Sequence, residues 1–69
     1  MANERKYHTF IVWDTEQACW MDEFGDYCKA DVMAECREHP AKGKHKRVIT
    51  HGDSSAEMLA ERDAQPAPK

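Results

Sequence analysis

The sequence predicts a small α+β domain: an antiparallel sheet, made of a β-hairpin and a third strand, with one main helix packed on it and a short C-terminal helix. Three observations support this ββαβα order. Residues 7–13 are rich in β-branched and aromatic side chains, residues 27–38 repeat apolar side chains at helical spacing, and residues 45–51 form a short segment of strand composition that is charged at one end. Because the chain has only 69 residues, we expect a single domain over residues 1–64 and a disordered tail over 65–69.

The first strand is the clearest element. Its sequence, YHTFIVW over residues 7–13, suits a pleated sheet because β-branched and aromatic side chains pack well there. Tyr7 and Ile11 fall on one face, and Phe10 and Val12 fall on the other. A strand that is apolar on both faces is usually central in its sheet or covered on both sides, and we predict that position here.

Residues 14–17 open either a hairpin turn or a helix. In the first case residues 18–24 return as a second strand, and in the second case Asp14 is the N-cap of a helix. Trp20 and Phe24 lie four apart, which suits both a helix face and a strand face. We favour the hairpin because the first strand needs a neighbour, and a short connection supplies one locally.

A helix is predicted over residues 27–38, with Asp26 as its N-cap. His39 belongs to the last turn, where an imidazole complements the helix dipole, and Pro40 stops the helix. The predicted apolar stripe consists of Cys28, Val32, Met33 and Cys36.

After a loop over residues 41–44, residues 45–51 form the third strand, which is predicted to be an edge strand because lysine there discourages stray pairing. Ser54 and Glu57 then have capping-box spacing, so a helix is predicted over residues 55–64. Its apolar content is thin. We expect it to dock on the sheet, to swap onto another chain or to bind a partner.

The cysteines favour a reducing compartment. There are three of them, an odd number, and no N-terminal apolar run of signal-peptide type precedes them. The longest apolar run, residues 10–13, is too short to span a bilayer. We therefore expect a cytoplasmic protein with no membrane contact.

Charge is segregated along the chain, although the net charge is only −3. Residues 14–38 hold eight acidic against two basic residues, a charge of −6, whereas residues 42–47 carry +4. The acidic stretch suits a basic partner or imitates a nucleic-acid backbone, and the basic stretch suits phosphates. Two other interpretations stay open: the charges screen each other within one fold, or they meet across a dimer interface.

Chemistry-bearing motifs are sparse, so we expect no enzyme activity and no cofactor. No glycine-rich elbow, oxyanion loop or phosphate loop is present, since Gly25, Gly43 and Gly52 are isolated. Asp22 and Glu23 are adjacent, so in a strand they face opposite sides and cannot act as an acid–base pair.

A zinc-stabilised domain is a minor alternative. Cys36 and His39 form a single C-x-x-H pair, but a structural zinc site normally needs a second pair of ligands. We expect Cys36 to be a small buried hydrophobe instead, because it falls on the apolar stripe.

The leading hypothesis is a protein-interaction module that regulates or inhibits a macromolecular partner and forms a homodimer. Its size and arrangement are typical of small accessory proteins of bacteria and their phages. Tryptophan side chains are favoured interface anchors, and the carboxylates supply charge. The other interpretation of Trp13 and Trp20 is that they pack on each other across the hairpin as a cross-strand pair. The expected partner-binding residues are Trp13, Trp20, Asp22, Glu23, Asp31 and Glu35. The alternative is a nucleic-acid contact through Lys42, Lys44, Lys46 and Arg47.

Overall fold

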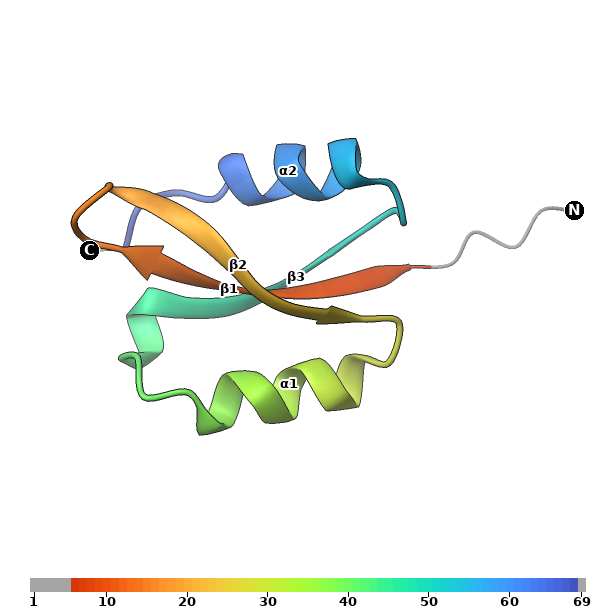
Figure 1. Cartoon of the computed structure of the whole chain (residues 1–69), viewed down its shortest axis with the longest axis horizontal. Helices are drawn as coiled ribbons and strands as arrows, with labels where there is room; N and C mark the ends of the chain where they lie inside the picture. The colour runs from red at the N-terminus through yellow and green to blue at the C-terminus, as the bar shows by residue number, and fades with distance from the viewer. Residues whose placement is uncertain (1–5, 69) are drawn as a thin grey trace, which may run out of the picture.

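The computed structural model describes residues 6–68 and shows a three-stranded antiparallel sheet with two helices (Figure 1). The elements are β1 (Tyr7–Asp14), β2 (Cys19–Asp26), α1 (Lys29–Glu38), the 3-10 helix η1 (Gly43–His45), β3 (Lys46–His51) and α2 (Ser55–Asp63). The strand order is β2-β1-β3. The predicted ββαβα fold is therefore confirmed, with β1 as the central strand and the lysine-bearing β3 at one edge.

The two helices lie on opposite sides of the sheet, which gives the molecule three layers (Figure 1). On the α1 side, Phe10 and the helix residue Val32 are buried, and no other residue of α1 is. On the α2 side, Ile11, Trp20 and Ile49 form the core cluster. Because successive residues of β1 point to opposite faces, one strand supplies both halves of the core.

The hairpin between β1 and β2 is confirmed, and the helical alternative for residues 15–24 is wrong. Asp14 closes the turn, since its Oδ1 accepts the N–H groups of Glu16 at 2.9 Å and Gln17 at 3.1 Å. Ala18 completes the turn with a φ of 54°, in the left-handed region that favours glycine.

β2 runs two residues beyond its predicted end at Phe24, to Asp26. Gly25 stays in the strand because the Tyr7 ring lies over it, and a Cβ there would stand 2.5 Å from Tyr7 Cε2. The glycine therefore marks a close approach between β1 and β2, although the sequence predicted that the strand ends at Phe24.

A β-bulge interrupts the pairing of β1 with β2. Phe10 faces Phe24, but the next residue, Ile11, faces Asp22, so Glu23 is an additional residue with no Cα partner. Asp22 lies on the α2 side of the sheet, where Arg62 Nη1 donates to its Oδ1 at 3.0 Å.

α1 begins at Lys29, two residues later than predicted, and the expected cap is wrong. Asp26 Oδ1 accepts the N–H of Cys28 at 3.0 Å, so this carboxylate closes the turn before the helix. Cys28 occupies the N-cap position without a side-chain cap bond and is exposed. The predicted apolar stripe therefore shrinks to Val32 with the half-buried Cys36, and Met33 is exposed as well.

The C-terminal helix docks on the chain's own sheet. Ser54 is its N-cap as predicted, with Oγ accepting the N–H of Glu57 at 3.1 Å. α2 ends at Asp63, and the chain continues along the sheet. Gln65 and Pro66, placed in the expected tail, make contacts there: Arg47 Nη1 donates to Gln65 Oε1 at 2.9 Å, and the Pro66 carbonyl accepts an indole N–H.

Candidate functional site

The hollows of the surface gather around edge strand β2. Glu23 lines three of them, with volumes of about 420, 300 and 280 Å³. The bulge explains this position, because an extra residue bends the strand and leaves space beside it on each face. Three hollows therefore meet in the neighbourhood of Glu23.

The 300 Å³ hollow lies between β2 and the C-terminal end of α1, and we call it the acidic groove. It is lined by Phe10, Glu23, Phe24, Glu35, Glu38, His39 and Pro40. Three of these residues carry carboxylates, and among residues 6–68 no lysine or arginine lines the groove. The groove combines an aromatic floor with a negatively charged rim.

The rim is built by the spacing of acidic residues on α1. Asp31, Glu35 and Glu38 are four and three residues apart, so they lie on one side of the helix. Like charges at this spacing repel each other and weaken a helix. Among residues 6–68, no ion pair is recorded for any of these three carboxylates. The three carboxylates are therefore exposed to solvent and give this side of α1 a negative charge.

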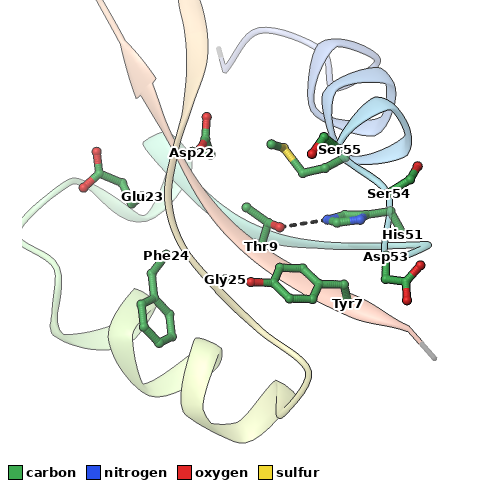
Figure 2. Close-up of a pocket in the computed structure, with 11 residues that line it drawn as sticks. Tyr7, Thr9, Asp22, Glu23, Phe24, Gly25, His51, Asp53, Ser54 and Ser55 are labelled. Atoms are coloured by element: carbon green, nitrogen blue, oxygen red, sulfur yellow. Dashed lines mark hydrogen bonds between the residues drawn. The ribbon is translucent and has the colours of Figure 1, made fainter.

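The floor is aromatic because Phe10 and Phe24 face each other across the strands. Phe10 is buried, whereas Phe24 is 37% exposed and lies on the α1 side of the sheet (Figure 2). The His39 ring stands edge-on to Phe10, with centroids 5.3 Å apart. Its Nδ1 accepts the N–H of Ala41 at 3.1 Å, so in the neutral ring the other nitrogen carries the proton. That nitrogen is 4.0 Å from the Glu23 carboxylate.

The structure divides the predicted partner-binding residues. Glu23 and Glu35 meet in the acidic groove, and the exposed Asp31 lies on the same side of α1. Asp22 lies on the opposite face of the sheet, paired with Arg62 at 3.0 Å. Glu38 belongs to the groove and was missed, although its spacing from Glu35 on the predicted helix was a signal for it.

Trp20 is no exposed anchor, because it is only 3% exposed. Its ring packs edge-to-face on Trp13 with centroids 5.3 Å apart, and its Nε1 donates to the Pro66 carbonyl at 3.2 Å. Trp13 itself is half-buried and packs against the core cluster. The two indoles therefore form a cross-strand pair, and this packing covers the aromatic surface that a partner would need.

The basic segment is largely occupied within the fold. Lys46 Nζ donates to the carbonyls of His39 at 2.8 Å and Arg37 at 3.4 Å. The guanidinium of Arg47 lies 4.9 Å from the centroid of the Trp20 ring. Only Lys42 and Lys44 of the predicted nucleic-acid set are exposed. The four charges therefore do not form one continuous surface.

The 420 Å³ hollow lies on the α2 side, and a threonine–histidine pair borders it (Figure 2). His51 Nδ1 donates to the Gly52 carbonyl at 2.6 Å, so in the neutral ring Nε2 accepts from the Thr9 hydroxyl at 2.7 Å. A hydroxyl bonded to an imidazole is also the arrangement of a nucleophile and its base. However, Thr9 is only 4% exposed, so a substrate has little access to its oxygen.

The candidate zinc ligands do not lead to a metal centre in the part of the chain that is described. Within residues 6–68, no three histidine, cysteine or carboxylate side chains gather as metal ligands do. Cys36 is half-buried on α1, and the His39 ring is held between Phe10 and the Ala41 N–H.

No helix between residues 6 and 68 is long and apolar enough to cross a bilayer.

Comparison of the chain with protein-family models, with curated protein sequences and with solved structures gives no match.

Proposed function

We propose that this protein is an interaction module that binds a basic surface of another protein through the acidic groove, and that it regulates or inhibits this partner. The observation that carries the proposal is the surplus of carboxylates around an exposed aromatic ring. Glu23, Glu35 and Glu38 line the same groove as Phe24, and the described part of the chain contributes no lysine or arginine to this lining. Aromatic residues with a charged rim are the composition of protein interfaces.

A protein partner has more support than a nucleic acid. Phosphates would meet negative charge at the groove, and two of the four cations of the basic segment, Lys46 and Arg47, make contacts within the fold.

The three cysteines are free thiols, which supports a reducing compartment as the place where the protein acts.

The test is a pull-down from lysate, with and without nuclease treatment, with a tagged chain and two charge-matched variants. The groove variant carries Glu23→Gln, Glu35→Gln and Glu38→Gln. The control variant carries Glu16→Gln, Asp53→Asn and Glu61→Gln, which are exposed carboxylates outside the groove. We expect the groove variant to lose a partner that the wild type and the control both retain. Raised salt should weaken the wild-type complex in the same way, because the attraction is electrostatic.

Equal retention by all three proteins would contradict the proposal. Loss of the partner on nuclease treatment would instead indicate a nucleic-acid contact through Lys42 and Lys44. Circular dichroism of both variants checks that each remains folded, so that a lost partner reports on the groove.

A further inference from the structure

We infer that the acidic groove receives one arginine side chain from an exposed segment of the partner protein. This inference rests on the proposed function and deepens it, because it names the group that enters the groove. Charge complementarity carries it: the groove has three carboxylates and an aromatic floor, and its lining contains no lysine or arginine from residues 6–68.

The size of the groove sets the size of its occupant. Its volume is about 300 Å³, the lower end of the range for ligand pockets, about 300–1,000 Å³. It also opens to solvent along β2, which is an edge strand of the sheet in the described part of the chain. A single long side chain that enters from a bound segment fits this shape.

The floor suits the stem and the flat head of arginine. Phe24 is exposed beside Pro40, so it offers apolar surface to a methylene chain and a ring face to a guanidinium. The same molecule already uses this contact elsewhere, since the Arg47 guanidinium lies 4.9 Å from the centroid of the Trp20 ring.

The rim suits arginine better than lysine. A guanidinium has five N–H donors in one plane, so it can donate to Glu35 and Glu38 from α1 and to Glu23 from β2 at the same time. An ammonium is compact and strongly hydrated, and it gains less from a flat aromatic floor. Glu23 retains capacity for such a donor, because its contact with His39 Nε2 is as long as 4.0 Å.

The test is an amide-resolved NMR titration of the full chain with Nα-acetyl-L-arginine amide. We expect saturable shifts at Phe24, Glu35 and Glu38, with a Kd on the order of millimolar, as one side chain allows. The amide resonance of Met58, which lines the 420 Å³ hollow and does not line the groove, should not move. The citrulline analogue has nearly the same shape without the charge, and it should bind at least about fivefold more weakly.

Variants assign the effect to the rim. Glu35→Gln and Glu38→Gln should each weaken arginine binding by about two- to fivefold, the range expected for an exposed ion pair. Glu57→Gln on α2 lies outside the groove and should leave it unchanged.

Three outcomes would overturn the inference. The lysine analogue could shift the same resonances with equal affinity, which would make the site a general cation site. The groove resonances could move with protein concentration alone, which would assign the groove to a second copy. The arginine analogue could also cause no shift while the pull-down still depends on the three carboxylates. In that last case this inference fails and the proposed function stands, whereas failure in both experiments would remove both.

Discussion

At the scale of single residues, two threonine–histidine pairs connect β1 to β3 on opposite faces of the sheet. Thr9 and His51 form the buried pair, with 2.7 Å between Oγ1 and Nε2. His8 and Thr50 form the exposed pair, with 2.8 Å between Nδ1 and Oγ1. Both pairs join a threonine hydroxyl to an imidazole nitrogen, and they differ in burial. Comparing them therefore measures how much more the free energy of unfolding falls when a buried hydrogen bond is removed than when an exposed one is removed.

We expect Thr9→Val to lower the free energy of unfolding by about 1–3 kcal/mol, because it leaves a buried imidazole nitrogen without its bond. Thr50→Val, the matched control, should change the free energy of unfolding by no more than about 0.5 kcal/mol, because water can replace the hydroxyl. Urea denaturation measures both. If the two losses are equal, the buried bond has no special importance.

Backbone conformation gives a second prediction at this scale. Ala18 has a φ of 54°, and a left-handed alanine costs about 1–2 kcal/mol, whereas a fixed glycine costs about 0.5–1 kcal/mol of entropy. Ala18→Gly should therefore raise the free energy of unfolding by about 0.5–1 kcal/mol.

The control is the same substitution in a regular helix. Ala34 lies inside α1, where Ala34→Gly should lower the free energy of unfolding by about 0.5–1 kcal/mol. Thermal melts that move in opposite directions would support the assigned turn, and two losses would contradict it.

At the scale of elements, α2 depends on its ends and on polar contacts more than on a buried face. The structure buries none of its residues fully, and the helix is held by Ser54 at its start and by the ion pair of Arg62 with Asp22. A short helix with a thin apolar face is marginal, so each of these contacts matters.

Ser54→Ala should lower the free energy of unfolding by about 0.5–2 kcal/mol, because the N–H of Glu57 loses its acceptor. The adjacent Ser55→Ala serves as control: that serine is inside the helix, is exposed and accepts no cap bond. Hydrogen exchange of the α2 amides locates the effect. Equal acceleration in both variants would show that the cap is not what holds this end.

Element types followed from the sequence, and element ends did not. The composition of residues 7–13 and the spacing of Ser54 with Glu57 are local signals, and both predictions are confirmed. The end of β2 depends on Tyr7, which packs on Gly25 from another strand. The bulge at Glu23 likewise depends on pairing between strands, so no local pattern marked it.

At the scale of the whole molecule, the acidic groove combines residues from two elements. Glu35 and Glu38 lie on one side of a helix that the sequence predicted, whereas Glu23 comes from β2 beside the bulge. The prediction that Trp20 is an exposed anchor was wrong because its burial involves a distant segment. The Pro66 carbonyl, in the chain beyond α2, accepts the indole N–H. Charge spacing on one element was readable, and the meeting of distant segments was not.

The C-terminal segment gives a prediction at this scale. Removal of residues 65–69 deletes the acceptors of the Trp20 indole and of Arg47. Two net hydrogen bonds are worth about 1–3 kcal/mol, so the free energy of unfolding should fall by that amount. The tryptophan emission should also shift to longer wavelength as Trp20 meets water. Removal of Lys69 alone is the control, and an identical spectrum after the longer deletion would contradict these contacts.

The edge-to-face packing of Trp13 and Trp20 also gives the hairpin an optical signature. Two indoles 5.3 Å apart and inclined at 74° couple their electronic transitions, so their circular dichroism splits into neighbouring bands of opposite sign. The amide groups of α1 and α2 give a separate helix signal. Stopped-flow recording of this couplet beside the helix signal would show whether β1 and β2 join before or after the helices form, without an added dye or label.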